Sequence, residues 1–379
     1  MRLLVIGHTY IAAANRGVLR RTAARGHSVT MVTPQKWPDP LFDIKAQPEQ
    51  GQCGAISLPA LAPGRESWYV LRKMSDALRD ADPDLVRVDH GPGTMICWQA
   101  ARLRKRLWPK ARLLFFTWWN VPWSLRPPQS TAERAVLADA DAAICGNRAA
   151  MELLKGRGFT KPMSVIPQLG VNPDIFKPGD PKQARARLSV PPEVPIIGFV
   201  GRLVQEKGVF DLLQAFSRIP EPAQLLMLGR GEARDELHAQ AGRLGLSARV
   251  HFVPSVPHSE VPGLLPAFDV LVLPSKPGKG WQEQFGHVLT EAMSSGVPVI
   301  GADSGEIPHV MGDAGLLVPH SNPDNLADAL GRVLDDDQLR RQMIDRGLDR
   351  VRKHYSDRAV ADACLDFYGS ILEGREVLS

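Results

Sequence analysis

Two series of alternating apolar and amphipathic segments, separated by a proline-rich stretch, constrain the fold of this 379-residue chain more than any other feature. In the first half, apolar residues recur at helical spacing in Val18–Arg25, Tyr69–Arg79 and Thr94–Leu107. Short apolar runs predict strands at Leu3–Ile6, Ser28–Val32, Asp84–Val88, Arg112–Phe116, Ala142–Ile144 and Ser164–Ile166. Strands that alternate with helices predict a mostly parallel sheet covered by helices.

The second half repeats the pattern after residues 173–195, where prolines are dense enough to interrupt helices and strands. Helices are expected at Phe210–Ile219, Asp235–Leu244 and almost throughout 323–372. Strands are expected at Ile196–Val200, Gln224–Leu228, Arg249–Val253, Val270–Leu273 and Val297–Ile300. We therefore predict an α/β chain of two Rossmann-like, doubly wound domains that face a cleft, with ligands at the carboxyl ends of the strands.

Composition and charge narrow the class of protein. Hydrophobic residues make up 44% and charged residues 23% of the chain, the balance of a soluble globular protein. The net charge of +5 favours anionic partners weakly, and no motif indicates nucleic-acid binding. Four scattered cysteines without zinc spacing indicate reduced structural thiols and no metal site. No apolar run is long enough for a signal peptide or a spanning helix, so we expect a cytoplasmic protein.

The stretch GFVGRLVQEKG, residues 198–208, places glycines and two cations between a predicted strand and a predicted helix. Glycine permits close approach of the backbone to a ligand, and a helix N-terminus favours negative charge. Arg202 and Lys207 add one forked and one point-like cation. This combination suits a diphosphate, and a βα turn with two solvated cations is the alternative.

Two carboxylates, Glu283 and Glu291, lie on either side of an expected loop-to-helix junction near Gly286. Glu283 is then on the loop, and Glu291 is about two turns into the helix. The first can accept hydrogen bonds from sugar hydroxyls and the second from a ribose, while the first helical N–H groups face phosphate. A surface loop with one buried capping glutamate is the alternative for this pair taken alone.

A third motif, Gly229-Arg230-Gly231-Glu232, follows another predicted strand. It lacks the third glycine of a dinucleotide fingerprint, which favours a tight turn beside the ligand.

In this order, the motifs resemble the retaining glycosyltransferases of family four, the glycosyl transferases group 1, which have the two-domain GT-B fold. The similarity runs through GFVGRLVQEKG, LLMLGRGEARDEL, DVLVLPS and EQFGHVLTEAMSSGVPVIGADSGEIPHVMGDAGLLV, and VIPQLGVNPDIFKP at 165–178 resembles the end of the family's N-terminal domain. The resemblance implies an acceptor-binding domain at 1–178, a donor-binding domain at 179–355, and a final helix at 356–379 that packs back on the first. It also implies a UDP- or GDP-sugar donor, no required cofactor, a glycan or lipid-linked acceptor, and retention of anomeric configuration.

The family's functional residues carry over to matching positions. Arg202 and Lys207 would hold the diphosphate and act in catalysis together with Glu283, which would contact the donor sugar. Glu291 would contact the ribose. The other residues expected around the donor are Gly201, Gly229, Val253, Phe285, Gly286, His287, Val288 and Leu289.

The N-terminal half departs from the family pattern. Gly7-His8-Thr9-Tyr10 replaces a common Gly-Gly loop, and Thr117-Trp118-Trp119-Asn120 replaces a common His. The acceptor candidates lie at or just after predicted strand ends: His8, Asn15, Arg16, Asp89, His90, Trp118, Trp119 and Asn120. Tryptophan faces suit sugar rings, and core packing is the alternative for this pair.

A basic stretch, Arg102–Arg112, lies near Trp98 and Trp108. Such a stretch is typical of a solvated helix face, or of a surface that docks on anionic lipid, here at the inner face of the plasma membrane.

Two other functions compete with sugar transfer: a nucleotide-sugar epimerase of the same fold, and a non-catalytic scaffold. An epimerase would change the donor sugar without any acceptor, and a scaffold would not require both carboxylates and both cations. A dehydrogenase is disfavoured because neither half has a complete Gly-x-Gly-x-x-Gly after its first strand.

Overall fold

A computed structural model describes residues 1–38, 43–49, 51 and 53–374. Its contacts divide the chain into two compact units, which are described separately below. Unit 1 combines Met1–Gly170 with the C-terminal segment from Asp357, and unit 2 is Val171–Ser356.

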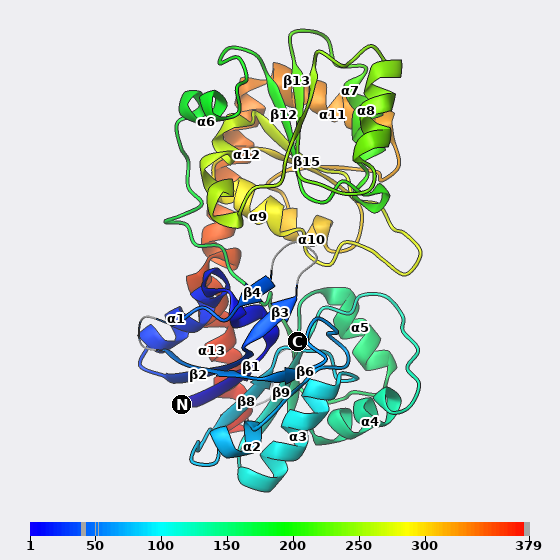
Figure 1. Cartoon of the computed structure of the whole chain (residues 1–379). Coiled ribbons are helices and arrows are strands. Elements are labelled where there is room, and N and C mark those ends of the chain that lie inside the picture. Colours follow the sequence, from blue (N-terminus) through cyan, green and yellow to red (C-terminus); the bar gives the residue numbers. More distant parts are fainter. Residues whose placement is uncertain (39–42, 50, 52, 375–379) are drawn as a thin grey trace. The chain divides into compact units, whose positions relative to one another are not determined.

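Unit 1 is built on a seven-stranded parallel sheet in the order β11-β10-β9-β8-β1-β2-β5 (Figure 1). Its strands are β1 (Arg2–Ile6), β2 (Ser28–Pro34), β5 (Cys53–Leu58), β8 (Leu85–Val88), β9 (Arg112–Thr117), β10 (Ala142–Cys145) and β11 (Met163–Val165). Its helices are η1 (His8–Ile11), η2 (Ala13–Arg16), α1 (Gly17–Ala24), α2 (Met74–Ala77), α3 (Met95–Leu107), α4 (Gln129–Asp139), α5 (Arg148–Gly156) and α13 (Asp357–Glu373). Two antiparallel hairpins pair β3 (Lys36–Pro38) with β4 (Asp43–Lys45) and β6 (Ala60–Leu61) with β7 (Val70–Leu71).

Strand β1, near the middle of the unit 1 sheet, is apolar on both faces from Leu3 to Ile6 because the core covers both. Along β1, Leu4 and Ile6 join the core that includes Ile96 of α3. The intervening Leu3 and Val5 join the core formed with α1 and α13. This two-residue alternation, with apolar residues at every position, is what a fully covered parallel sheet requires.

Unit 2 repeats the plan with a six-stranded parallel sheet in the order β14-β13-β12-β15-β16-β17. Its strands are β12 (Ile196–Val200), β13 (Gln224–Leu228), β14 (Val250–Val253), β15 (Val270–Leu273), β16 (Val299–Ala302) and β17 (Leu316–Val318). Its helices are α6 (Pro181–Arg187), η3 (Gln205–Lys207), α7 (Val209–Phe216), α8 (Arg234–Arg243), η4 (His258–Gly263), η5 (Leu265–Ala267), α9 (His287–Ser294), α10 (Ile307–Met311), α11 (Pro323–Asp335), α12 (Asp337–Arg350) and the π-helix η6 (Val351–Tyr355).

The predicted α/β class and the parallel sheets are confirmed, and two local predictions are wrong. Residues 69–79 do not form a helix throughout, because the Gln99 side chain bonds both the N–H and the carbonyl of Leu71 and so holds this segment extended. Helix α2 begins only after Lys73, which has a left-handed φ of 58°. The proline-rich stretch 173–195, in which prolines are predicted to interrupt helices and strands, contains helix α6, because Pro181 begins this helix, where its missing N–H costs nothing.

In each sheet, the order in which successive strands are added reverses at one point, the topological switch point. In unit 1 this point lies between β1 and β8, and in unit 2 between β12 and β15. Loops leave the two neighbouring strands on opposite faces there, and polar side chains can enter the gap. These two carboxyl edges are where the candidate functional residues gather. Along the chain as far as it is described, no helix is long and apolar enough to cross a membrane.

Candidate functional site

Glu283 is the centre of the polar site at the switch point of unit 2. Its side chain is buried, and its Oε2 accepts hydrogen bonds from Lys207 Nζ at 2.6 Å and Ser275 Oγ at 2.7 Å. Lys207 ends η3 beyond β12, and Ser275 follows β15. The Lys207 ammonium also lies 5.2 Å from the ring centre of Trp281. The site thus joins the two motifs that the sequence placed 76 residues apart.

Close backbone packing holds the loops of this site together. Gly208 follows Lys207 with a φ of 67°, and a Cβ there would lie 1.9 Å from the Pro274 carbonyl oxygen. Gly229 lies against the turn after β12, because a Cβ there would lie 1.9 Å from the Gly201 carbonyl oxygen. Any other residue at either position would push its loop away from the neighbouring strand.

The backbone also connects the predicted residues at the ends of β12, β13 and β14. Gly201 N–H donates to the Leu228 carbonyl, and Gly229 N–H donates to the Val253 carbonyl. Arg202 follows Gly201 with an exposed side chain that has no hydrogen-bond or ion-pair partner among the described residues. One cation of the pair is therefore held by a carboxylate, and the other is exposed to solvent.

Helix α9 starts at this edge and carries the second carboxylate. Gly286 precedes it with a φ of 84°, while the rings of Phe285 and His287 lie 4.7 Å apart. Glu291 lies one turn into α9, and its Oε1 is 2.8 Å from His258 Nε2. Val288 is half-buried and Leu289 fully buried, so the Leu289 side chain belongs to the core.

At the switch point of unit 1, His8 and His90 meet directly. His8 Nδ1 lies 3.0 Å from His90 Nε2, and Tyr69 OH lies 2.8 Å from the same nitrogen. The His8 ring stacks on Trp37 at 4.2 Å between ring centres. Burial lowers the pKa of His8 to about 4 and lowers that of His90 as well. Both imidazoles are therefore neutral at pH 7 and can bond hydroxyl groups.

Asp89 is the buried carboxylate beside these histidines. It pairs with Arg87, whose Nε lies 2.5 Å from Oδ1, and it accepts a hydrogen bond from Tyr10 OH. Gln168 Nε2 donates to Asp89 Oδ2 at 3.2 Å, and Gln168 Oε1 accepts from Trp118 Nε1 at 3.0 Å. The chain of bonds therefore fixes the Trp118 indole to the sheet edge.

The remaining acceptor candidates surround this edge unequally. Trp119 is half-buried with its ring 4.7 Å from that of Trp123, and Asn120 is buried. Asn15 donates from Nδ2 to the Thr9 carbonyl at 2.9 Å. These side chains belong to the same unit, and His8 and His90 touch one another directly.

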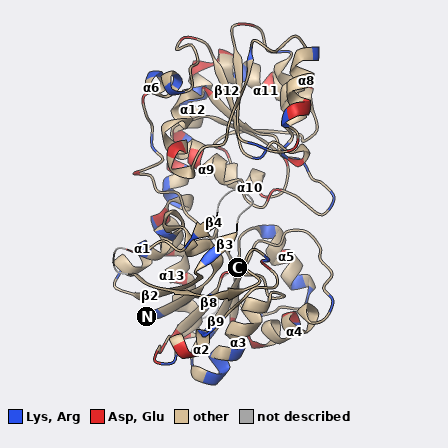
Figure 2. Cartoon of the chain, viewed as in Figure 1, with Lys and Arg blue, Asp and Glu red and all other residues tan. Residues whose placement is uncertain are grey.

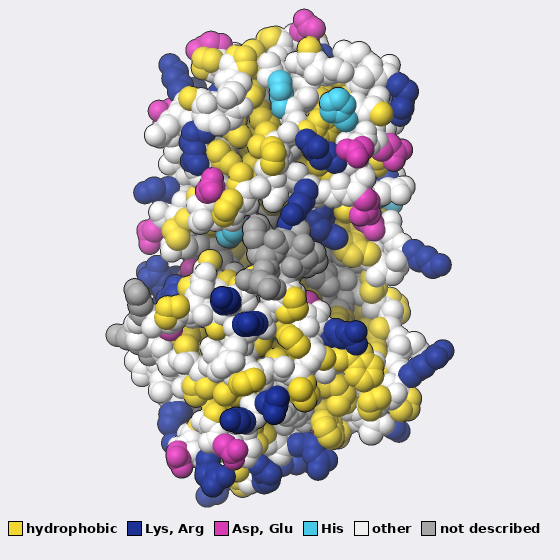
Figure 3. All heavy atoms as spheres, viewed as in Figure 1, with side chains coloured by type: hydrophobic (Ala, Val, Ile, Leu, Met, Phe, Trp, Pro, Cys, Tyr) yellow, Lys and Arg dark blue, Asp and Glu magenta, His cyan; other side chains and the backbone are white. Residues whose placement is uncertain are grey.

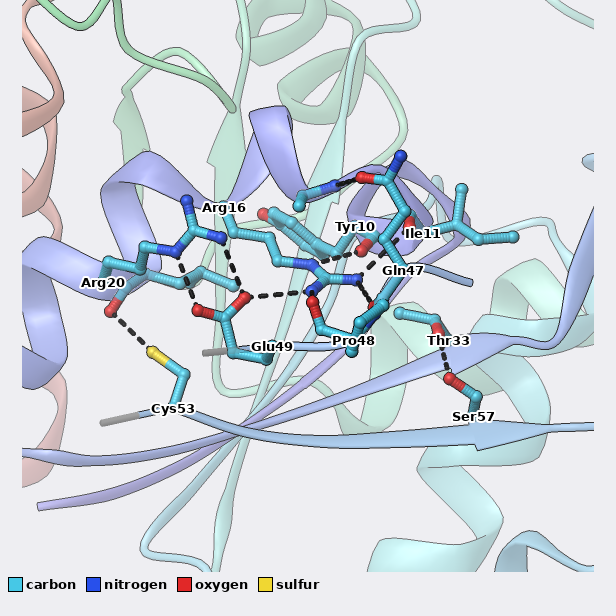
Figure 4. A network of polar contacts seen from close by, with 12 residues as sticks. Tyr10, Ile11, Arg16, Arg20, Thr33, Gln47, Pro48, Glu49, Cys53 and Ser57 are labelled. Carbon is cyan, nitrogen blue, oxygen red and sulfur yellow. Dashed lines mark hydrogen bonds and ion pairs between the residues drawn. The ribbon is translucent and has the colours of Figure 1, made fainter. Parts of the chain in front are cut away.

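Arg16 has a different environment from the other candidates (Figure 4). It is 1% exposed, and each of its five N–H groups is engaged inside the protein. Its acceptors are the carbonyls of Tyr10, Ile11, Gln47 and Pro48 and the carboxylate of Glu49. This guanidinium holds the segment 47–49 against η1, and it has no donor left for a ligand.

Among the residues that contact the predicted ones without having been singled out from the sequence are Ser275, Trp281, His258 and Gln168. Ser275 lies two residues after the end of β15, at the switch point, so topology would have identified it. The other three reach the site through tertiary contacts, for which the local sequence carries no signal.

Two parallel-sheet units, each with a polar site at its switch point, define the class of the GT-B fold. Solved structures share this fold along nearly the whole chain. Sucrose-phosphate synthase from Thermosynechococcus elongatus has a TM-score of 0.74 at 24% identity and covers 99% of this chain and 100% of its own. HepE from Anabaena has a TM-score of 0.72 at 17% identity, and the match covers 98% of this chain and 100% of HepE.

The chain belongs to the glycosyltransferase family. Residues 180–350 match the family described as glycosyl transferases group 1, and residues 11–169 match the glycosyl transferase 4-like domain. D-inositol 3-phosphate glycosyltransferase of Corynebacterium jeikeium is 30% identical over 66% of this chain and 67% of its own length. Lipopolysaccharide core biosynthesis glycosyltransferase LpsE of Rhizobium meliloti is 33% identical over 49% of this chain and 53% of its own. The chain thus spans between about half and two thirds of these two relatives.

Proposed function

We propose that the protein transfers a sugar from a nucleoside-diphosphate sugar to a hydroxyl acceptor, with unit 2 holding the donor. The observation that carries this proposal is the buried Glu283 at the switch point, bonded to Lys207 and Ser275. A buried carboxylate held by a cation is a preorganised acceptor for sugar hydroxyls, and a cation at the same point suits a diphosphate.

The donor residues divide by the part of the ligand that they fit. Arg202 has an exposed guanidinium that fits the diphosphate. Lys207, which is paired with Glu283, supplies a second positive charge for it. Glu283 fits the sugar, and Glu291, farther along α9, fits the ribose. The diphosphate gains negative charge as the sugar leaves, so these cations and the N–H groups that begin α9 stabilise the transition state more than the ground state.

UDP is the nucleotide that we propose for the donor. HepE, which shares the fold, has been solved in complex with UDP and with UDP-glucose. A thermal-shift screen of UDP, GDP and their sugars tests this choice, because a ligand at 100 times its dissociation constant adds about 2.7 kcal/mol of stability. A shift with GDP and none with UDP would contradict the proposal.

The acceptor site that we propose is the switch point of unit 1. His8 and His90 supply neutral imidazoles, and Trp118 and Trp119 supply aromatic faces. Arg16 is left out because its donors are used internally. The names of the two relatives, an inositol phosphate transferase and a lipopolysaccharide core transferase, support a hydroxyl-rich glycan or a lipid-linked acceptor.

Product analysis separates sugar transfer from the competing epimerase. Incubation with UDP-sugar and acceptor should release UDP in step with a new glycoside. An epimerase would convert the donor sugar with no acceptor present, and a scaffold would leave the donor unchanged.

We also propose that unit 1 docks on an anionic membrane through residues 60–112, which include the β6–β7 hairpin and α3. Apart from the buried Arg87–Asp89 pair, residues 60–112 contain ten Lys and Arg but five Asp and Glu. The net charge of this segment is therefore +5, equal to the net charge of the whole chain. Figures 2 and 3 show Lys and Arg along this part of unit 1. Trp68 and Leu61 on the hairpin are 47% and 53% exposed, which adds apolar contact beside the charge. Trp108, by contrast, is buried and takes no part.

Vesicle sedimentation tests the docking surface. Wild type should bind phosphatidylglycerol vesicles at low salt and phosphatidylcholine vesicles hardly at all. Arg102→Glu with Lys110→Glu should abolish binding, whereas the matched pair Arg234→Glu with Arg243→Glu, exposed on α8 of unit 2, should not. An equal loss of vesicle binding in both double variants would indicate a general charge effect and would contradict the proposed docking surface.

A further inference from the structure

His258 holds the carboxylate that the proposed function places at the donor ribose. Its Nε2 lies 2.8 Å from Glu291 Oε1, although the two residues come from different elements, η4 and α9. The Glu291 side chain is 13% exposed and that of His258 is 58% exposed. The imidazole is therefore the outer partner of this pair.

The position of His258 relative to α9 is supported by a third residue. The Phe176 ring lies 5.5 Å from the His258 ring, and the Phe176 carbonyl accepts a hydrogen bond from Ser294 Oγ at the end of α9. The loop that carries the histidine and the helix that carries the glutamate are thus both fastened to one segment. The packing of unit 2 therefore fixes the contact between His258 and Glu291.

The charges around His258 favour its protonated form. Glu291 faces it from α9, and the hydrogen bond between them raises the pKa of His258 against the opposing effect of burial. His287, also on α9, is a second titratable group that interacts with it, and burial lowers the pKa of His287. Glu260 on η4 is engaged with Arg187 at 3.9 Å.

We propose that His258 is a positioning residue for the donor, which in its protonated form orients the Glu291 carboxylate to accept the two ribose hydroxyls. This inference rests on the proposed donor site. A carboxylate offers about four lone-pair positions, so one bond to His258 leaves room for a diol. The diphosphate brings negative charge to the same edge and favours the imidazolium further. Donor binding should therefore take up protons where His258 titrates, and affinity should fall as pH rises.

Calorimetry with UDP between pH 5.5 and 8.5 tests this role in three proteins. His258→Ala should bind UDP roughly tenfold more weakly than wild type at the acid end, the loss expected for one charge-assisted hydrogen bond. His258→Gln keeps an N–H donor but cannot titrate, so it should recover part of the affinity. Titration of the UDP phosphate is common to all proteins and cancels in the comparison of their pH profiles. His320→Gln, an exposed histidine of the same unit, is the matched control and should follow wild type.

The Glu291→Gln background shows whether His258 acts through the carboxylate. In that background, His258→Ala should cause no further loss of UDP affinity. Wild-type affinity and pH profile in His258→Ala would overturn the positioning role and leave the donor site standing. Failure of the wild type itself to bind UDP would instead overturn the donor site, and this inference with it.

Discussion

At the scale of single residues, the two cations of the proposed donor site differ in their surroundings. Lys207 is paired with the buried Glu283, and Arg202 is exposed. Either change to Ala should weaken UDP binding by an order of magnitude or more, because each removes a charge-assisted hydrogen bond worth roughly 1.5–3 kcal/mol.

Thermal unfolding should then distinguish these two variants. Lys207→Ala leaves a buried carboxylate without its cation and should lower the melting temperature, whereas Arg202→Ala should not. Uridine, which has no phosphate, serves as the control ligand and should bind both variants as it binds wild type. Equal loss for UDP and uridine would show that these residues do not contact phosphate.

The two glutamates should separate by ligand. Glu291→Gln should weaken the binding of UDP itself, because the ribose belongs to the nucleotide. Glu283→Gln should leave UDP affinity nearly unchanged and lower turnover, because it meets only the transferred sugar. Titration of both variants with UDP and steady-state kinetics with the sugar donor give the comparison, and identical behaviour toward UDP would refute the assignment.

The residues of the proposed donor site follow from local sequence patterns more directly than those of the proposed acceptor site. Lys207 and Glu283 sit in motifs whose spacing is set by local strand, turn and helix geometry, and the structure brings them within 2.6 Å. Arg16 looked equally suitable, but its five partners come from segments up to 33 residues away. Burial of a charged side chain by distant backbone carbonyls leaves no local pattern to detect.

At the scale of elements, the start of α13 contains a carboxylate in an unfavourable place. Asp357 is buried, and burial raises its pKa from 3.8 to about 6 against the opposing effect of Arg21 and Arg20. The folded protein therefore holds this proton more tightly than the unfolded chain does. As pH rises from about 4 to about 6, this group should reduce stability, by up to roughly 2–3 kcal/mol above that range.

Asp357→Asn should remove this pH dependence and stabilise the protein at pH 7. The difference in the free energy of unfolding between the variant and wild type should disappear below pH 4, where both side chains are neutral. Denaturant unfolding at pH 4, 5, 6 and 7 measures it, with Asp366→Asn on an exposed position of α13 as control. A variant less stable than wild type at pH 7 would mean that the ionised carboxylate is favourably bonded.

Elements were predicted well wherever the apolar pattern decided the structure. Strands β12, β13 and β15 have the residues expected for them, because buried parallel strands are continuous apolar runs. The helix predicted for residues 69–79 does not form along its whole length, because the side chain of Gln99 from α3 fixes Leu71 in an extended conformation. A helical spacing of apolar residues cannot report such a bond.

At the scale of the whole molecule, sugar transfer should not require an added metal ion. The paired aspartates, the kind of residues that hold a metal ion, lie in unit 1 and are engaged: Arg2 binds Asp82 and Asp84, Lys105 binds Asp139 and Arg112 binds Asp141. In the proposed donor site, Arg202, Lys207 and the start of α9 would supply the positive charge for the diphosphate instead. Full activity in EDTA is expected, and loss that magnesium or manganese restores would contradict this.

The transferred sugar should keep its anomeric configuration. Inversion needs a general base placed opposite the leaving group, and a base works best with a pKa near the operating pH. His8 has its pKa lowered to about 4, and that of His90 is lowered too, while Asp89 is tied to Arg87 and Tyr10. These groups suit the binding of hydroxyls better than the removal of their protons.

A double displacement would need a protein nucleophile on the far face of the sugar, and Glu283, bonded to Lys207 and Ser275, is assigned to the sugar hydroxyls. The remaining route is attack from the same face. The acceptor oxygen bonds to the anomeric carbon as the bond to the diphosphate breaks, and the leaving phosphate oxygen takes the acceptor's proton. Proton NMR of the fresh product reads the anomer directly: an α-linked donor should give an α-linked product, and a β-linked product would overturn this mechanism.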